Sequence, residues 1–296
     1  MDDQIVGVSI QDSHISVGLV DFGTRKVIRG SLQRKRVNNS DSAEEITSAW
    51  TKVMREVSQI TKTEITKIGI AIPGVYNYES GILLKRINGG RYAGLYGRNL
   101  KELLSAQLEI DKSSIRMASD SASFLQGEIF GGAGRGFSRS LGVTLGIGLG
   151  AAKYYNRVVE NAQMYSMPYL DSIAEDYISV RWLLNRYASL SGNTINSMME
   201  LNQLAAKEPV VLQVFDEFSQ NLSQFLISFI DQSNINPEVV VVGGHLETSN
   251  RFFFDNTVKT MKLNGIKIPI LRAVLGEEAS IIGAASMWYE MNAIHS

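Results

Sequence analysis

The sequence contains no cysteine, which excludes disulfide bonds and metal sites built from thiolates. Histidine is scarce as well, because the chain has only His14, His245 and His295. These three lie too far apart in the sequence for any standard ligand spacing. We therefore expect no metal held by the protein's own side chains, and no zinc.

The sequence also lacks an excess of charge and a long apolar run. Lys and Arg number 29 against 30 Asp and Glu, which gives a formal net charge of −1 and argues against binding to nucleic acid or to an anionic membrane. No apolar stretch reaches the length of a membrane span, and the acidic start M-D-D-Q lacks a signal-peptide core. We expect a cytoplasmic protein.

What is present is an ordinary globular composition, with 296 residues of which 44% are hydrophobic. The order of the predicted elements indicates two α/β halves. The first has an antiparallel meander over residues 5–32, a helix after the capping box Ser42/Glu45, and a buried strand that ends at Pro73-Gly74. Beyond residue 153 the pattern is mostly helical, with one helix over 173–187, a buried strand ending at Gly243-Gly244 and a closing helix over 277–292.

The two halves resemble each other weakly. The opening hairpin G-V-S-I-Q-D-S-H-I-S-V-G-L is echoed by G-V-T-L-G-I-G-L-G-A-A-K, and the strand before Pro73-Gly74 is echoed by the one before Gly243-Gly244. This repetition predicts two domains, residues 1–117 and 118–296, with a cleft between them. The last helix is expected to pack back toward the N-terminal domain.

The stretch from residue 114 to 153 contains the residues that most clearly suggest a catalytic or ligand-binding function. A short strand ends at Asp120, a helix and a glycine-rich loop follow, and a hairpin then carries Gly146, Gly148 and Gly150. A carboxylate at a strand end can take a hydroxyl proton, while bare backbone N–H groups can hold nucleotide phosphates. The alternative is structural, because Asp is a favoured helix N-cap and glycine also serves tight hairpins.

Several segments, in order, resemble the ROK family (repressor, open reading frame, kinase) within the actin-like ATPase fold of sugar kinases. They are I-G-I-A-I-P-G-V at 68–75, the S-D segment at 119–120 with Glu128 beyond it, T-L-G-I-G-L-G at 144–150, N-P-E-V-V-V-V-G-G at 236–244, and L-G-E-E-A-S-I-I-G-A-A at 275–285. The resemblance covers nearly the whole chain. It implies a two-domain, ribonuclease H-like α/β fold, a homodimer, and a cleft that binds Mg²⁺-ATP and a hexose.

By this resemblance, Asp120 is the general base for the sugar hydroxyl. The implied nucleotide-binding residues are Ser9, Gln11, Asp12, Ser13, Thr144, Gly146, Ile147, Gly148, Gly243, Gly244 and His245. The implied substrate-binding residues are Pro73, Gly74, Asn88, Ser119, Asp120 and Tyr169. His245 has an equally good interpretation as a residue at a helix start, and packing or a dimer contact competes with ligand binding for the aromatic and methionine residues near Tyr169.

The sequence departs from the family pattern at residues that carry chemistry. The first phosphate loop of the family, D-x-G-G-T, is replaced by Ser9, Gln11, Asp12 and Ser13, so both glycines are absent and Asp12 adds a like charge. Ile147 stands where the family has threonine. The zinc loop is missing, and the sugar-clamping G-E-x-G-H falls near Pro168, Tyr169, Asp171 and Ser172, without its Glu and His.

Two functions remain open from the sequence. The first is an ATP-dependent kinase acting on a hexose hydroxyl, and the second is a non-catalytic sugar- or nucleotide-binding descendant of the kinase scaffold. A DNA-binding repressor fits poorly, because the first strand begins at Ile5 with no helix-turn-helix before it.

Overall fold

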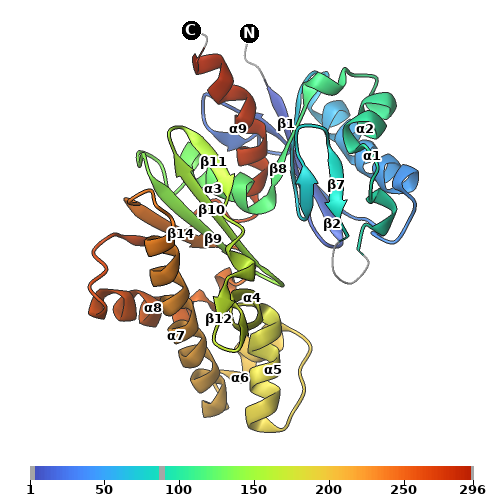
Figure 1. Cartoon of the computed structure of the whole chain (residues 1–296). Helices are drawn as coiled ribbons and strands as arrows, with labels where there is room; N and C mark the ends of the chain where they lie inside the picture. Colours follow the sequence, from blue (N-terminus) through green and yellow to red (C-terminus); the bar gives the residue numbers. More distant parts are fainter. Residues whose placement is uncertain (1–3, 87–90, 295–296) are drawn as a thin grey trace. The chain divides into compact units, whose positions relative to one another are not determined.

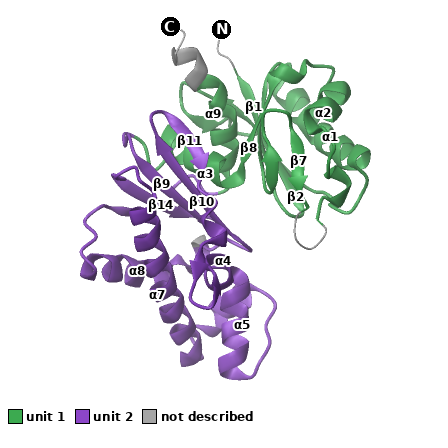
Figure 2. Ribbon diagram, viewed as in Figure 1, with its two compact units in different colours: residues 1–135, 277–296 green, residues 136–276 purple. Residues whose placement is uncertain are grey.

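The structure is a computed structural model that describes residues 4–86 and 91–294, apart from the side chains of Glu247 and of residues 290–294. The chain forms two compact units (Figures 1 and 2). Unit 1 comprises residues 1–135 and 277–296, and unit 2 comprises residues 136–276. Unit 1 is therefore built from two separate stretches of sequence.

The sheet of unit 1 is organised around a central pair of strands, β1 (Ile5–Ile10) and β5 (Ile68–Ile72), which run parallel. β2 (His14–Asp21) pairs with β1 antiparallel, and β8 (Ile115–Ser119) pairs with β5 parallel. The strand order is β3-β2-β1-β5-β8, with β3 (Lys26–Val27) and β4 (Gln33–Arg36) both pairing with β2. The sequence predicts a longer third strand over 26–32, which the structure replaces with these two short edge strands.

Helix α1 (Ala43–Thr61) covers one face of this sheet. It begins with the predicted capping box, in which Ser42 and Glu45 satisfy each other's backbone N–H groups. The apolar residues of α1 recur at helical spacing and form one buried stripe along the helix. This stripe packs against the strand side chains that point to the same face of the sheet, including Val8 and Ile70. The same layer holds α2 (Leu100–Leu108), the short 3₁₀ helices η2 (Ala93–Leu95) and η3 (Lys112–Ser114), and the hairpin β6 (Val75–Asn77) with β7 (Ile82–Lys85).

The opposite face is covered by α9 (Glu278–Ile294), which lies directly on the strand backbones. A row of glycines makes this approach possible, because Gly18, Gly7 and Gly69 stand side by side on β2, β1 and β5. A Cβ atom on Gly7 would overlap the carbonyl oxygen of Ile281, and one on Gly69 would overlap that of Ala284. Side chains larger than hydrogen are therefore excluded at these two positions.

The row ends at Arg116 of β8, which pairs with Gly69. The Arg116 guanidinium lies 3.9 Å from the centre of the Trp288 ring and donates a hydrogen bond to the carbonyl of Met287. The Trp288 Nε1–H in turn donates to the Ile68 carbonyl oxygen at 3.0 Å. A cation–π contact and two hydrogen bonds to backbone thus fix α9 at this edge of the sheet.

Helix α3 (Asp120–Gly131) packs closely along α9 through a second set of small residues. A Cβ on Gly127 would overlap the Ala279 carbonyl, and one on Gly283 would overlap the Ser123 carbonyl. This contact assigns α3 to unit 1. The units therefore divide after Arg135, whereas the sequence analysis places the boundary at 117/118 and puts Asp120 in the second domain.

Unit 2 repeats the strand arrangement of unit 1. Strands β9 (Ser140–Leu145) and β10 (Leu149–Tyr155) form an antiparallel hairpin, and β14 (Val239–Gly243) and β15 (Ile270–Arg272) follow in parallel. The strand order of unit 2 is β11-β10-β9-β14-β15, with β11 (Val158–Asn161) at one edge. Its strands β10-β9-β14-β15 correspond, in this order, to β2-β1-β5-β8 of unit 1. The similarity between the two halves of the sequence is therefore a similarity of topology.

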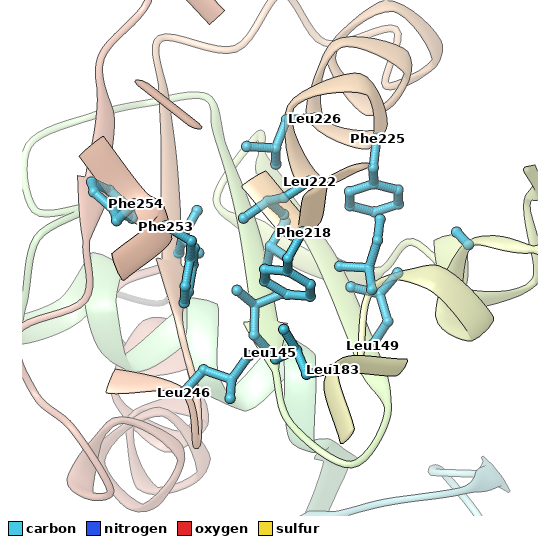
Figure 3. Close-up of a cluster of buried hydrophobic side chains, with 14 of the residues drawn as sticks. Leu145, Leu149, Leu183, Phe218, Leu222, Phe225, Leu226, Leu246, Phe253 and Phe254 are labelled. Carbon is cyan, nitrogen blue, oxygen red and sulfur yellow. The ribbon is translucent and has the colours of Figure 1, made fainter. Parts of the chain in front are cut away.

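Helices α7 (Pro209–Gln232) and α8 (Asn250–Leu263) pack on each other and contribute most of the aromatic side chains of the unit 2 core. In Figure 3, Phe218 and Phe225 from α7 and Phe253 from α8 lie around Leu145 and Leu149 of the hairpin. The smaller elements of this unit are η4 (Met164–Ser166), the two-residue strands β12 (Pro168–Tyr169) and β13 (Ser172–Ile173), α6 (Met198–Leu204) and η5 (Glu247–Ser249).

The single helix predicted over 173–187 is wrong, because the structure has two helices there. They are α4 (Ala174–Tyr177) and α5 (Val180–Ser191). The first helix ends at its C-cap Ile178, and Ser179 caps the second, since its side chain accepts a hydrogen bond from the Trp182 N–H at 3.3 Å. Hydrophobic periodicity continues across the break, and for this reason it did not reveal the break.

Substitution of Gly69 by alanine tests the glycine row. We expect Gly69→Ala to lower the free energy of unfolding by about 3 kcal/mol, because a buried Cβ must displace helix backbone and not a flexible side chain. Urea unfolding followed by tryptophan fluorescence measures this effect, since Trp50 and Trp288 both belong to unit 1. Gly23→Ala is the matched control, because its Cβ would meet only the carboxylate of Asp21 at 3.2 Å; equal losses in both variants would contradict the argument.

Candidate functional site

The candidate residues of unit 1 gather where β8 ends and α3 begins. Ser119 is the N-cap of α3, and its side-chain oxygen accepts a hydrogen bond from the Ala122 N–H at 3.2 Å. Asp120 is the first residue of the helix, and its Oδ1 accepts from the Ser121 N–H at 2.9 Å. The cap position is therefore filled by Ser119, which removes the N-cap interpretation of Asp120. The Asp120 side chain is exposed, at the positive end of the helix dipole.

The parallel pairing of β5 and β8 brings Pro73 and Gly74 beside this helix start. Ile72 is opposite Ser119 in the register, so the residues that follow each strand emerge at the same edge of the sheet. Gly74 has φ of 116°, a conformation that favours glycine, and its carbonyl oxygen accepts a hydrogen bond from the Tyr78 hydroxyl at 2.9 Å. Pro73, Gly74, Ser119 and Asp120 thus lie at the same edge of the unit 1 sheet.

Tyr78 is a member of this group that the sequence analysis missed. Burial raises the pKa of the Tyr78 phenol, the negative charge of Asp120 raises this pKa further, and a hydrogen bond with the Ser119 side chain lowers it. The hydrogen bond to the Gly74 carbonyl holds the Tyr78 hydroxyl beside the segment that follows β5.

The turn between β1 and β2 is tied to other segments of unit 1. Asp12 forms an ion pair with Arg91, and its carbonyl accepts a hydrogen bond from the Asn39 side chain. The Tyr92 hydroxyl donates to the Gln11 carbonyl, and the Gln11 N–H donates to the His14 carbonyl at 2.9 Å. The charge that Asp12 brings to this loop is therefore balanced by Arg91, which the sequence analysis did not anticipate.

The two serines of this turn differ in exposure. Ser9, within β1, is only 2% exposed, so its side chain faces the interior. Ser13 is exposed, and its hydroxyl lies 2.7 Å from Nδ1 of His14. The four residues 9, 11, 12 and 13 therefore do not form one surface: Gln11, Asp12 and Ser13 make the turn, while Ser9 packs beneath it.

In unit 2 the hairpin turn between β9 and β10 carries Gly146, Ile147 and Gly148. The Gly146 N–H donates to the Gly148 carbonyl at 3.1 Å, and the Gly146 carbonyl accepts from the Val180 N–H at 2.8 Å. Ile147 is 62% exposed at the tip. The turn is therefore closed by its own backbone and fixed to the start of α5.

The Glu175 carboxylate lies against the same turn. Its Oε2 accepts a hydrogen bond from the Leu149 N–H at 3.1 Å, and a Cβ on Gly148 would stand 2.6 Å from this oxygen. One backbone donor at the start of β10 is thus used by a carboxylate within the protein. The sequence analysis missed Glu175, although its place at the start of a helix after the hairpin was a usable signal.

Gly243, Gly244 and His245 follow β14 beside this turn. The register places Gly243 opposite Thr144. Gly244 has φ of 101°, and a Cβ there would stand 2.6 Å from the Leu145 carbonyl oxygen, so its glycine is required by strand packing whether or not a ligand is present. Nδ1 of His245 lies 3.2 Å from the place a Cβ on Gly146 would take. The predicted nucleotide-binding residues of unit 2 therefore converge at one end of its sheet.

Tyr169 does not take the position expected of a sugar ligand. It is 8% exposed, and its hydroxyl lies 2.8 Å from Oε1 of Gln224 on α7. Burial and the neighbouring Tyr177 raise the pKa of the Tyr169 phenol to about 12. The structure gives Tyr169 a packing role in the unit 2 core, the alternative that the aromatic and methionine stretch left open.

Asn88 lies outside the described residues, so its predicted role is not tested. Over the described residues no three His, Asp or Glu side chains are grouped so that they could hold a metal ion. Within the same part of the chain, no helix has both the length and the apolar character needed to span a bilayer.

The fold and these two groups of residues define a class of protein: the chain has the two-domain α/β fold of the actin-like sugar kinases. Among solved structures, the ROK hexokinase from Thermus thermophilus matches over 98% of this chain and 99% of its own, with a TM-score of 0.78 and 19% sequence identity. A ROK-family glucokinase from Streptomyces griseus, in complex with glucose and AMPPNP, matches over 96% and 98% with a TM-score of 0.77 and 19% identity.

Within that class, the resemblance to the ROK family is confirmed. A curated relative, the N-acetylgalactosamine kinase AgaK of Shewanella sp. (strain ANA-3), is 25% identical over 256 residues, which cover 76% of this chain and 79% of that protein. No family model matches the sequence.

The buried phenols of unit 1 predict a pH dependence. Burial raises the pKa values of Tyr76, Tyr78 and Tyr92 above their ordinary value, so the folded state holds these protons more tightly than the unfolded state. Their contribution to stability is complete below the unfolded pKa of about 10 and is lost as the pH rises above it.

We therefore expect the unfolding free energy to fall above about pH 10. We also expect the phenolate absorbance of the native protein to rise at a higher pH than that of the urea-unfolded chain. Tyr76→Phe should remove one late-titrating phenol. Coincident native and unfolded titration curves would contradict the prediction.

Proposed function

We propose that the protein is a ROK-type sugar kinase that transfers the γ-phosphate of ATP to a hydroxyl group of a hexose, with Asp120 as the general base. The observation that carries the proposal is the N-terminus of α3. Ser119 caps the helix, so the exposed carboxylate of Asp120 is not needed for that structural task. It stands at a strand end next to Gly74, where a hydroxyl group can reach it.

In the proposed reaction the Asp120 carboxylate accepts the proton of the sugar hydroxyl as its oxygen forms a bond to the γ-phosphorus. The bond from that phosphorus to the β,γ-bridging oxygen breaks, and ADP leaves. The proton therefore ends on Asp120 and the phosphoryl group on the sugar. We propose a substrate-binding role for Pro73, Gly74 and Ser119, which lie at the same sheet edge as Asp120.

The nucleotide-binding role is proposed for the turn at Gly146–Gly148, for Thr144 and for the segment Gly243–His245. Support comes from their convergence at one end of the unit 2 sheet and from the AMPPNP in the Streptomyces griseus glucokinase. Gln11, Asp12 and Ser13 form the corresponding turn of unit 1, for which we propose contact with the phosphates. Mg²⁺ would be bound with the nucleotide and would supply positive charge to the transferring phosphoryl group.

The substrate class is proposed as a hexose or an N-acetylated hexosamine. The curated relative is by name an N-acetylgalactosamine kinase, and the two solved structures are by title a hexokinase and a glucokinase. A homodimer and a cytoplasmic location are proposed on the family resemblance alone. Size-exclusion chromatography with light scattering tests the first, with twice the 32.7 kDa chain mass expected.

Removing the base provides the direct test. We expect Asp120→Asn to lower the turnover of sugar phosphorylation about 10²- to 10⁴-fold, the range that a general base contributes, with little change in thermal stability. A coupled assay that detects ADP, run over a panel of hexoses and N-acetylhexosamines, measures it. Wild-type turnover in Asp120→Asn would show that the assigned role is wrong.

Asp111→Asn is the matched control. It also removes one negative charge from unit 1, but Asp111 caps a 3₁₀ helix through a bond to the Ser113 N–H at 2.7 Å, a task that Asn performs as well. Its turnover should equal that of the wild type.

A second function, a non-catalytic binding protein on the same scaffold, is favoured by one specific observation. The Glu175 carboxylate accepts the Leu149 N–H, and Asp12 and Arg91 form an ion pair on the first turn, so groups of the protein already engage both predicted phosphate loops. The negative charge of Glu175 at the second turn opposes binding of a nucleotide phosphate there.

Calorimetry with Mg²⁺-ATP separates the two functions. The kinase requires binding of the nucleotide, and Glu175→Gln should tighten it because the negative charge is lost while the acceptor oxygen is kept. Sugar binding without any nucleotide binding, in wild type and Glu175→Gln alike, would favour the non-catalytic protein.

A further inference from the structure

Basic side chains point to both faces of the unit 1 sheet at its β4 edge. Side chains alternate along a strand, so Lys35 points to one face, and Arg34 and Arg36 point to the other. Lys35 forms an ion pair with Glu56 of α1 at 3.5 Å. Arg34 instead donates from Nη1 to both carboxylate oxygens of Glu277, just before α9, at 2.8 and 3.0 Å. Arg36 therefore lies on the α9 face of β4.

His14 stands opposite Arg36 across the β2–β4 pair. The register pairs these two residues, and beyond them the Val37 N–H donates to the Ser13 carbonyl at 3.0 Å. This pattern makes His14 and Arg36 a pair without backbone hydrogen bonds of its own, the type in which side chains stand closest. Nδ1 of His14 lies 2.7 Å from the Ser13 hydroxyl, so Nε2 is the ring nitrogen left for another partner.

Positive charge is in excess around this pair. Arg34 is neutralised by Glu277, but Arg36 forms no ion pair with any residue in the part of the chain that the structure describes. Burial and the charges of Arg34 and Arg36 lower the pKa of the His14 imidazole, while Glu277 opposes them. An anion bound between His14 and Arg36 would relieve the repulsion between them.

The His14–Arg36 pair and Asp120 lie at one edge of the sheet. β1, β5 and β8 run parallel, so β8 ends at this edge just before Asp120. β2 begins at the same edge with His14, and β4 ends there with Arg36. Three strand spacings of about 4.8 Å separate β2 from β8, which makes about 14 Å. A triphosphate along this edge can place its terminal phosphorus toward Asp120 and an inner phosphate beside the pair.

We propose that His14 and Arg36 form a side-chain site for a phosphate group of the nucleotide, in which the guanidinium and the Nε2–H donate to the phosphate oxygens. The identity of the ligand rests on the proposed kinase function. Backbone donors of a glycine loop are missing from the turn before β2, and two side chains on neighbouring strands provide donors in their place. Arginine suits this role, because its planar group can bind two phosphate oxygens at once.

The test compares Arg36→Gln with the matched control Lys35→Gln, which removes the same charge from the same strand on the α1 face. Titration calorimetry with Mg²⁺-ATP, and with tripolyphosphate as a probe without adenosine, measures binding. We expect Arg36→Gln to weaken both about tenfold, the loss of one charge-assisted hydrogen bond, and Lys35→Gln to change neither by more than about twofold.

Equal losses in the two variants would overturn the site, because Lys35 and Arg36 would then act only as general charges on an edge strand. Affinity of Arg36→Gln equal to that of the wild type would also overturn it, as would a wild type that does not bind tripolyphosphate.

A second measurement does not depend on activity. The chain has three histidines, so His14→Gln assigns the His14 signal in the proton spectrum of the imidazoles. In the free protein, Arg36→Gln should raise the pKa of His14 because a repelling charge is lost, and Lys35→Gln should leave this pKa unchanged. Tripolyphosphate should raise it in the wild type. A His14 pKa that does not respond to tripolyphosphate would contradict the proposal.

The phosphate site and the kinase function fail separately. Absence of sugar phosphorylation by the wild type, with tripolyphosphate still bound through Arg36, would overturn the kinase and support the site. Unchanged kcat and KM for ATP in Arg36→Gln would overturn the site and leave the kinase in place.

Discussion

The contact of α9 with bare strand backbone is the constraint on which the rest of unit 1 depends. Gly7 and Gly69 allow the helix to approach the sheet more closely than any side chain would permit, and Gly127 and Gly283 do the same between α3 and α9. Because α3 is held against α9, its N-terminus has a fixed place at the end of β8. The position of Asp120 therefore depends on glycines that lie far from it in the sequence.

Much of this fold could be predicted from the sequence. Short apolar strands, the Ser42/Glu45 capping box and the two glycine-ended strands gave the order of elements, and their repetition gave the shared topology of the two sheets. The assignment of α3 could not be predicted, because it depends on the fit between Gly127 of α3 and Gly283 of α9, two helices more than 140 residues apart in the sequence. The break at Ser179 was missed because apolar spacing continues through it.

The residues of the candidate site were predicted through the segments that resemble the family. The structure adds a physical reason for some of them, because Gly74 and Gly244 have the positive φ that favours glycine, and Ser119 is the helix cap that the sequence had suggested for Asp120. Arg91 and Glu175 could not be predicted, since each acts through a side chain that reaches a partner distant in sequence. Tyr169 shows the opposite error: an aromatic residue beside a lost motif suggested a ligand contact, but its hydroxyl bonds to α7.

The division of unit 1 between two stretches of sequence has a consequence for synthesis on the ribosome. Residues 4–135 leave the exit tunnel well before residues 277–294. The sheet face that contains Gly7 and Gly69 therefore lacks its covering helix α9 while unit 2 is being made. Unit 2 is continuous in sequence and can complete its core first. Helix α9 is therefore made after unit 2, and only then can it cover the sheet of unit 1.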